Sequence, residues 1–483
     1  MKYKQLSLTK PFSHNRVALY VYTGLVLITL ALLFVSQPAR SDFVQVKASE
    51  GAVQLIGKLS QTKLAQGNRQ TVYLDVGVKT PAQEIAIAPE RATDMVIVLD
   101  RSGSMSTARK MNYAKAAIRD VLARLNAGDR FALLSFANNS IVHSSLINVD
   151  NNNRNYLNNL INNISTGGGT NMGDGLNAAL QMLSANNSQR ARKVLLLSDG
   201  HANQGITDPN QLATIASRIT ETGSVLSTIG MGLDFNETLM AKLADHGMGH
   251  YAYLEDLTDL STILASNLQD SRNTYANSSH LEIKLGDGVQ LIDAGGYPLN
   301  HINSNTIYIA TGQLLANSHK SFVITFSVPT QSLGKFSLGV MQLVYQQQGN
   351  NYYAQITDTH LQMTTLKPAR KEEVVHSINH EVFKQSWLKN NLGRMQKKVS
   401  DLVRSGDQDK AKQVLSDYNS KLRQAEVESH VPMASVAMDD KIDKIAAEVK
   451  EAFAGSRADQ EVKRKRAAKS MQYGAMHEQR TTK

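Results

Sequence analysis

The chain has 483 residues, of which 42% are hydrophobic, and carries a net charge of +10. This composition excludes a disordered protein, and the length gives room for two to four domains. The absence of cysteine excludes disulfides, thiolate metal sites and cysteine-based catalysis. The positive charge comes from 24 basic against 17 acidic residues from Lys367 onward, and from four basic residues without an acid in residues 1–16. Because the stretch between is nearly neutral, we expect no nucleic-acid-binding surface there.

Residues 17–36 are predicted to form a transmembrane signal anchor. Residues 17–35 contain no charge and are long enough to cross the hydrocarbon core as a helix. The positive-inside rule places the basic head over residues 1–16 in the cytoplasm and the bulk of the chain on the far side, periplasmic or extracellular. This arrangement favours a bacterial inner membrane. A cleaved signal peptide is the alternative, although its apolar region is usually shorter.

Residues 43–90 are predicted to hold the first strands of a β-sandwich. The stretch 70–78 alternates well enough between polar and apolar residues for a half-buried strand. Pro81 and Pro89 then mark a connector, after which a different kind of pattern begins.

An apolar run over residues 95–99 ends in Asp100, with Ser102 and Ser104 at alternate positions behind it. A run without alternation is typical of a parallel strand covered on both faces, and ligands collect beyond the carboxyl ends of such strands. One carboxylate and two hydroxyls are hard oxygen donors, which favour Mg²⁺, Mn²⁺ or Ca²⁺ over softer ions. We therefore expect a cation site at this strand end.

Two later segments could complete the set of ligands. Three glycines at 167–169 precede Thr170, which offers another hydroxyl. A second apolar strand over 193–197 is followed by Ser198, Asp199 and Gly200. Because the carboxyl ends of parallel strands meet at one edge of a sheet, we expect Thr170 and Asp199 to lie close to Asp100.

The three segments resemble the von Willebrand factor A domain and its metal-ion-dependent adhesion site, in which an Asp-x-Ser-x-Ser motif is completed by a distant threonine and a distant aspartate. The match falls on Asp100, Ser102, Ser104, Thr170 and Asp199. The resemblance implies that Ser102 and Ser104 bind the metal directly and that the other three residues bind it directly or through water. It also implies an open coordination position for a carboxylate of a partner protein.

Three other interpretations of Asp100 remain open. It could be a strand-end residue that caps a helix together with Ser102 or Ser104, which would leave Asp199 unexplained. It could be the nucleophile of a phosphotransferase, but such sites usually carry a second acid two residues on, where this chain has Ser102. A serine hydrolase would place Ser104 in a glycine-flanked nucleophile elbow, which residues 102–106 do not form.

Residues 92–275 are predicted to form a doubly wound α/β domain, because strand and helix patterns alternate along them. Strands are expected at 95–99, 131–136, 194–197, 225–231 and 250–254, with an antiparallel edge strand at 141–146. Helices are expected at 105–125, 156–164, 172–183, 209–222, 237–245 and 257–275. The family resemblance implies the same fold.

Residues 280–366 show a two-residue period and are expected to complete the sandwich begun in 43–90, so that the α/β domain is an insertion between its halves. The same order occurs in bacterial proteins similar to calcium-activated chloride channel regulators and inter-alpha-trypsin-inhibitor heavy chains. The chain resembles these over roughly residues 50–365.

Residues 368–456 are predicted to form a helical hairpin that turns at Ser405, Gly406 and Asp407, with Trp387 as a packing residue. Residues 457–483 are predicted to be a basic flexible tail, because the run from Lys463 to Arg466 is typical of a solvated terminus. Contact of this run with anionic lipid or a cell-wall polymer is the alternative.

These features predict a membrane-anchored protein that binds an acidic residue of a partner protein through Mg²⁺, Mn²⁺ or Ca²⁺, in adhesion, scaffolding or complex assembly in the cell envelope, and that is not an enzyme. A regulator of a neighbouring membrane complex is the alternative, in which the helical region would matter most. A metal-dependent envelope hydrolase would need a general acid or base, for which His201 and His143 are the candidates.

Overall fold

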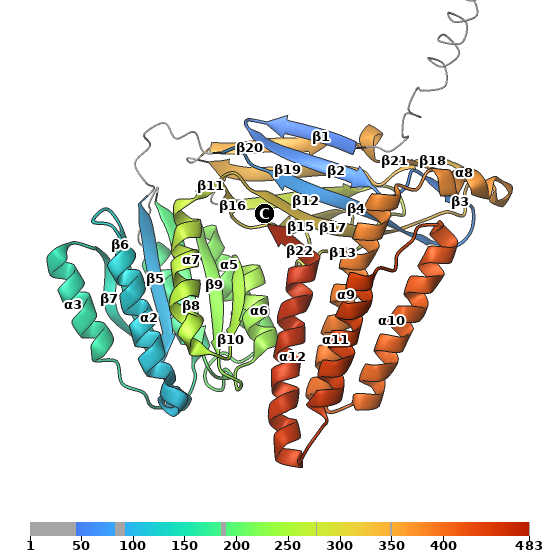
Figure 1. The fold of residues 1–483 in the computed structure, drawn as a ribbon. Helices are drawn as coiled ribbons and strands as arrows, with labels where there is room; N and C mark the ends of the chain where they lie inside the picture. The colour runs from blue at the N-terminus through green and yellow to red at the C-terminus, as the bar shows by residue number, and fades with distance from the viewer. Residues whose placement is uncertain (1–44, 83–91, 185–189, 277, 348–349, 483) are drawn as a thin grey trace, which may run out of the picture. The chain divides into compact units, whose positions relative to one another are not determined.

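The computed structural model describes residues 45–82, 92–184, 190–276, 278–347 and 350–482 (Figure 1). The predicted basic head over residues 1–16 and membrane anchor over 17–36 lie outside these ranges. Within the ranges, no helix combines the length and the apolar character needed to cross a bilayer. The described chain comprises an α/β region, a set of mainly antiparallel sheets and a group of C-terminal helices.

The α/β region is built on a six-stranded sheet with the order β10-β9-β8-β5-β6-β7. All neighbours pair in parallel except β7, which is the antiparallel edge strand predicted after β6. The central strands β5, β8 and β9 are buried along their whole length, which explains their long apolar runs. The strands are β5 (Thr93–Asp100), β6 (Arg130–Phe136), β7 (Ser140–Asn148), β8 (Ala191–Ser198), β9 (Ser224–Met231) and β10 (Met248–Leu254).

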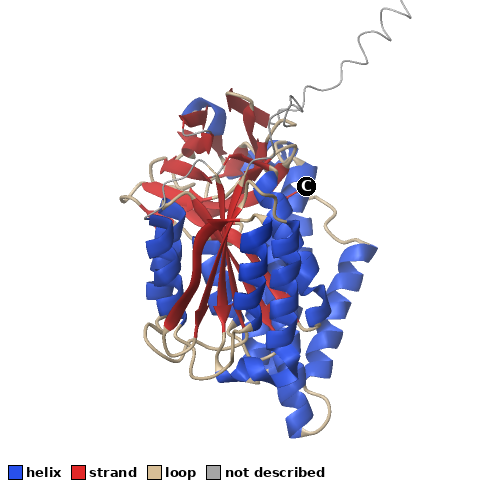
Figure 2. Cartoon of the chain, turned by 90° about the vertical axis from the view of Figure 1, so that its left-hand side faces the viewer, coloured by secondary structure: helices blue, strands red, loops and turns tan. Residues whose placement is uncertain are grey.

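Helices cover both faces of this sheet (Figure 2). Met95, Ile97 and Leu99 of β5 belong to one apolar core, and the alternating Val96 and Val98 belong to the other. The predicted doubly wound α/β fold is therefore confirmed. One core is covered by α2 (Lys110–Arg124), α3 (Asn151–Asn162) and α7 (Leu260–Arg272), and the other by α4 (Met172–Ser184), α5 (Pro209–Glu221) and α6 (Glu237–His246).

The helix that follows Asp100 begins later than predicted. Gly103–Arg109 form a 3₁₀ segment, η1, rather than the first turns of an α-helix. Ala108 and Arg109 take left-handed conformations with φ of 50° and 57°, which an α-helix does not accommodate. As a result, Lys110 is the first residue of α2.

Two larger antiparallel sheets enclose a separate apolar core. The first sheet combines strands that precede the α/β region in the sequence with strands that follow it. One sheet has the order β1-β2-β4-β17-β13, from β1 (Gln45–Glu50), β2 (Val53–Leu59), β4 (Gln70–Lys79), β17 (His319–Val328) and β13 (Gln290–Ala294). The other has the order β14-β15-β12-β19-β20, from β14 (Asn300–His301), β15 (Thr306–Ala310), β12 (Ser278–Leu285), β19 (Gly339–Gln347) and β20 (Asn350–Ile356). A small sheet joins β18 (Gly334–Ser337), β21 (Gln362–Leu366) and β3 (Lys63–Ala65), and β11 (Thr274–Ala276) pairs with β16 (Leu314–Leu315).

The α/β region lies in the sequence between two neighbouring strands of the first of these sheets. β4 precedes it and β17 follows it, and the two strands pair antiparallel along their whole length. At their end, Ser318 N donates to Thr80 Oγ1 at 2.9 Å, although 238 residues separate the two. The sheet is thus closed by strands from both sides of the insertion.

Five α-helices follow β21 in the described part of the chain. They are α8 (Lys371–His376), α9 (His380–Ser405), α10 (Gln408–Ser429), α11 (Val436–Ala452) and α12 (Arg457–Gln479). Gly406, at φ 86°, ends α9, and the Asp407 side chain caps α10, so the predicted hairpin turn is present. Trp387 is buried and packs on Tyr418, with 5.6 Å between the ring centroids, as expected for a packing residue.

The prediction of a flexible basic tail over residues 457–483 is wrong. Most of this stretch is the helix α12, which packs on α9 and buries Ala468 and Met471. It continues into β22 (Arg480–Thr482), which pairs antiparallel with β17. The helical hairpin predicted for 368–456 is correspondingly only part of a larger helical group that includes α12.

The basic residues of α12 are not simply solvated, because they meet acidic residues of the α/β region. Lys465 Nζ lies 3.2 Å from Asp234 Oδ1, and Arg466 Nε lies 2.7 Å from Glu255 Oε1. Lys469 Nζ lies 2.7 Å from Glu237 Oε2 in a buried contact. Each acid is more than 200 residues from its partner, and Arg466 and Glu255, for example, are 211 residues apart.

Candidate functional site

The carboxyl edge of the central sheet brings together the segments that the sequence singled out. β5 ends at Asp100, and its parallel neighbour β8 ends at Ser198, just before Asp199. The glycine-rich loop joins the same edge, since Gly103 N donates to Gly168 O at 3.0 Å. In Figure 2 this edge is the lower end of the sheet, where the connecting loops gather.

Short hydrogen bonds link four of the five predicted site residues. Asp100 Oδ1 accepts from Ser102 N at 2.8 Å, and Ser104 Oγ donates to Asp199 Oδ1 at 2.8 Å. The hydroxyl oxygens of Ser102 and Ser104 are 3.1 Å apart. The two aspartates, although 99 positions apart in the numbering of the chain, are thereby joined through the serine pair.

Thr170 completes the group beside Gly200. A Cβ atom on Gly200 would lie 3.3 Å from Thr170 Oγ1, 3.8 Å from Asp100 Oδ2 and 3.8 Å from Ser104 Oγ. The three oxygens therefore lie within 4 Å of one point, and this point is free of protein atoms because residue 200 is a glycine without a Cβ. Thr170 is fixed there because its backbone N donates to Asn203 Oδ1 at 2.8 Å.

The carboxylates of the site are buried, while one hydroxyl reaches the surface. Asp100 and Asp199 are completely buried, Ser102 and Thr170 nearly so, and Ser104 is exposed. Burial raises the pKa of Asp100 and the charge of Asp199 raises it further, whereas hydrogen bonds from Ser198 and Ser102 act in the opposite direction. Two buried carboxylates at such close quarters favour a bound cation, because each stabilises positive charge.

Two residues of the site were missed from the sequence. Ser198 Oγ donates to Asp100 Oδ2 at 2.6 Å, and Lys110 Nζ donates to Asp199 Oδ2 at 2.6 Å. Ser198 stands directly before Asp199, so its place at the strand end was a usable signal. Lys110 had no such signal, because its position depends on the unexpected backbone turn at Ala108 and Arg109.

The donor set fits a hard divalent cation. In the part of the chain that the structure describes, no group of three or more histidines, aspartates or glutamates is arranged to hold a metal. The site at the sheet edge is of another kind, because three of its five side chains are hydroxyls. Carboxylate and hydroxyl oxygens suit Mg²⁺, Mn²⁺ or Ca²⁺ better than Zn²⁺ or copper.

The two histidines considered as acid–base candidates lie in different surroundings. His201 is exposed in the loop after β8, two residues beyond Asp199. His143 lies on the edge strand β7, where its Nε2 is 2.7 Å from Ser135 Oγ, and burial lowers its pKa. Neither is hydrogen-bonded to a carboxylate that would orient it as in a catalytic triad.

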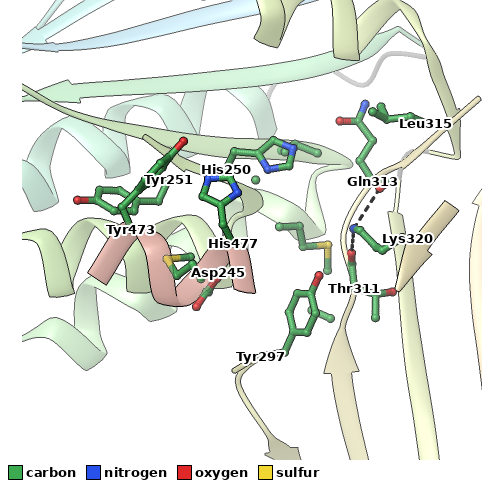
Figure 3. A pocket seen from close by; sticks show the side chains of 15 residues that line it. Asp245, His250, Tyr251, Tyr297, Thr311, Gln313, Leu315, Lys320, Tyr473 and His477 are labelled. Atoms are coloured by element: carbon green, nitrogen blue, oxygen red, sulfur yellow. Dashed lines mark hydrogen bonds between the residues drawn. The ribbon is translucent and has the colours of Figure 1, made fainter. Parts of the chain in front are cut away.

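A separate pocket of about 290 Å³ lies where the α/β region, the antiparallel sheets and α12 meet (Figure 3). His250, Tyr473 and His477 line one side of it, and Tyr297 and Lys320 line the other. The ammonium group of Lys320 already donates to the carbonyl oxygens of Thr311 and Gln313.

A family model described as the von Willebrand factor type A domain matches residues 94–266. The protein YfbK of Escherichia coli is 27% identical over 223 residues, which are 46% of this chain and 38% of the relative. Human inter-alpha-trypsin inhibitor heavy chain H4 is 30% identical over 201 residues, which are 39% of this chain and 21% of the relative. The chain therefore spans less than half the length of either relative.

Among solved structures, a von Willebrand factor type A protein from Catenulispora acidiphila aligns with a TM-score of 0.64 at 18% identity. The alignment covers 87% of this chain and 93% of that one. The similarity therefore extends beyond the central sheet, and at this identity it concerns the fold alone.

Proposed function

We propose that this protein binds an acidic side chain of a partner protein through a divalent cation, a proposal supported by the match of residues 94–266 to the von Willebrand factor type A model and by the motif residues. The observation that supports the proposal is the convergence of oxygen atoms around the space beside Gly200. The proposed ligands are those of the family's metal-ion-dependent adhesion site, Asp100, Ser102, Ser104, Thr170 and Asp199.

Each residue has a distinct part in this proposal. Ser102 and Ser104 would hold the ion directly, and Asp100, Asp199 and Thr170 would hold it directly or through water. The bound ion supplies residual positive charge and an open position for an Asp or Glu carboxylate of the partner. The exposure of Ser104 supports an open position on the solvent side.

Mg²⁺ is the proposed ion, with Mn²⁺ and Ca²⁺ as alternatives of the same class. The test is calorimetric titration of the full chain with MgCl₂, compared with Asp100→Ala and Ser102→Ala. We expect Mg²⁺ binding in the parent protein and its loss in both variants. An Asp208→Ala variant removes an exposed helix-capping carboxylate elsewhere in the α/β region and serves as the control. Equal Mg²⁺ affinity in all four proteins would refute the site.

The partner is tested by retention on the immobilised full chain. A partner of the proposed kind is retained in Mg²⁺, released by EDTA, and not retained by Asp100→Ala. Competition by free glutamate in the Mg²⁺ buffer distinguishes a carboxylate ligand from other contacts. A partner that stays bound in EDTA would contradict the proposed mode of binding.

We further propose that the protein is anchored in a bacterial inner membrane by residues 17–36, with the head at 1–16 in the cytoplasm and the bulk outside it. The apolar stretch behind a basic head supports this arrangement. Protease added to spheroplasts tests it, since the bulk of the chain should be degraded while a cytoplasmic marker is spared.

The proposed role is binding rather than catalysis. Exposed His201 and the strand residue His143 are the available acid–base candidates near the sheet edge, and neither is oriented by a carboxylate. A His201→Gln variant should therefore keep Mg²⁺ affinity and partner retention. Loss of function with Mg²⁺ binding intact would instead favour a hydrolase.

A further inference from the structure

We propose that the positive charge of Lys110 reduces the net negative charge of the metal site. This charge weakens binding of the metal and strengthens binding of a partner carboxylate to the bound metal. The inference rests on the proposed function, because it concerns the same site. It goes further by assigning a role to a lysine outside the metal-binding motif.

Lys110 is part of the site by contact and by burial. Its Nζ is 2.6 Å from Asp199 Oδ2, and its side chain is only 7% exposed. The other oxygen of Asp199 accepts from Ser104, so the carboxylate is held from both sides. Lys110 therefore acts on the metal through Asp199 and is a positioning residue rather than a metal ligand.

Local structure does not favour a lysine at this place. Lys110 is the first residue of α2, where the positive end of the helix dipole disfavours a cation. Two non-glycine residues in left-handed conformations, Ala108 and Arg109, precede it. Burial of an ammonium group adds a further cost unless it is paired. The position is thus explained by the partner, Asp199, and not by the helix.

The backbone at Gly232 leaves room for the aliphatic part of the Lys110 side chain. Gly232, after β9, has φ of 78°, and a Cβ on it would lie 3.2 Å from Lys110 Cε. Gly232 N donates to Leu254 O at 2.8 Å, which holds this turn in place. A side chain at position 232 would crowd the path from α2 to Asp199. The contact between Lys110 and Asp199 is therefore built from elements on both sides.

The charge balance gives the direction of the effect. Asp100 and Asp199 alone would bring two negative charges to a divalent cation, and Lys110 offsets one of them. The site then attracts the metal less strongly, but the loaded site keeps one more positive charge for an approaching carboxylate. The same lysine thus opposes the first binding step and favours the second.

The test is calorimetric titration of the full chain with MgCl₂ in Lys110→Met and Lys110→Arg. We expect Lys110→Met to bind Mg²⁺ more tightly by about tenfold or more, as for a unit charge a few ångströms from the ion at intermediate dielectric. Lys110→Arg should stay close to the parent value. Lys115→Met, on the same helix but bonded to Asn162 O, makes the same change in net charge and should leave the affinity unchanged.

The second arm probes the carboxylate directly. With the site loaded with Mn²⁺, acetate is titrated and followed by electron paramagnetic resonance. Lys110→Met should need about tenfold more acetate than the parent, by the same estimate. Weaker or unchanged Mg²⁺ binding in Lys110→Met, or unchanged acetate binding, would overturn the inference.

Thermal unfolding guards against a folding defect. Without Lys110 the two buried carboxylates repel each other, so Lys110→Met should have a lower Tm in EDTA and a larger rise with Mg²⁺ than the parent. If Lys110→Met does not fold in Mg²⁺, Lys110→Gln keeps a donor toward Asp199, and parent-like Mg²⁺ affinity in it would also overturn the inference. Failure of Mg²⁺ binding in the parent itself would instead refute the proposed function.

Discussion

Lys469 Nζ lies 2.7 Å from Glu237 Oε2, and this ion pair, with side chains 3% and 7% exposed, joins α12 to the first residue of α6. Lys469 also donates to Phe235 O at 2.8 Å and lies 4.2 Å from the centroid of the Phe235 ring. Arg404 of α9 adds a second cation, whose Nε is 2.7 Å from Glu237 Oε1. One glutamate of the α/β region is thus held by two helices of the C-terminal group.

Replacing Lys469 by methionine is expected to destabilise the protein by about 2 to 3 kcal/mol, because it leaves a buried carboxylate with Arg404 as its remaining cationic partner. Urea unfolding followed by circular dichroism measures the loss. Lys463→Met removes a surface pair with Glu451 and should cost less than about 1 kcal/mol. Equal effects of the two substitutions would show that the buried pair has no special weight.

The same glutamate predicts how this contact depends on pH. Burial alone would raise the pKa of Glu237, but the charges of Lys469 and Arg404 outweigh it, and the pKa lies below its ordinary value of 4.5. A carboxyl whose pKa is lowered by folding contributes stability that is fully present above the unfolded value and is lost as pH falls through the folded value. The free energy of unfolding should therefore decline below about pH 4.5. Glu237→Gln should show a smaller decline over this range, and a decline identical to that of the parent would argue against Glu237 as its source.

Gly200→Val is expected to block the metal site without unfolding the domain. The added methyls would enter the space between Thr170 Oγ1 and Asp100 Oδ2, only 3.3 and 3.8 Å from the Cβ position. Mg²⁺ affinity measured by calorimetry should fall by at least about tenfold. Gly128→Val is the matched control, since nothing lies within 4 Å of its Cβ position. Parent-like Mg²⁺ affinity in Gly200→Val would mean that the ion lies elsewhere.

Trp387→Ala should loosen the C-terminal helices and leave the metal site intact. Trp387 is 6% exposed and packs on Tyr418, so its truncation should cost about 3 to 5 kcal/mol. Hydrogen exchange should rise in α9 and α10, while Mg²⁺ affinity stays at the parent value. Tyr156→Ala, at a side chain that is 50% exposed, provides the comparison for a surface aromatic. A parallel loss of Mg²⁺ binding would instead show that the helices support the site.

The sequence predicted the parts of the site that depend on local pattern. An apolar strand followed by Asp100, Ser102 and Ser104 specifies both the sheet edge and the side chains that it presents. The parallel pairing of β5 with β8 then brings Asp199 to the same edge, as the repeated strand pattern indicated. The placement of these side chains at one sheet edge could be inferred because strand direction and side-chain chemistry are both determined by a few neighbouring residues.

The parts that failed depend on distant contacts or on unusual backbone. Nothing in the composition of Ala108 and Arg109 indicates left-handed conformations, so the place of Lys110 could not be inferred. The charges of α12 resemble a solvated terminus until Glu237 and Glu255 are placed opposite them. Whether a basic run is a solvated tail or packs against the protein depends on whether acidic residues lie opposite it. The tertiary fold decides this, because those acidic residues are distant in the sequence.

The pairing of β4 with β17 around the α/β region imposes an order on the assembly of the chain. β4 pairs on one edge with β2, which precedes it, but its other neighbour, β17, is available only after the whole insertion has been synthesised, whereas the insertion encloses apolar cores of its own. The inserted region can therefore acquire its structure first and bring the two strands together as it does so. A defect in the insertion would leave the edge of β4 unpaired, and such an edge is a template for aggregation between nascent chains.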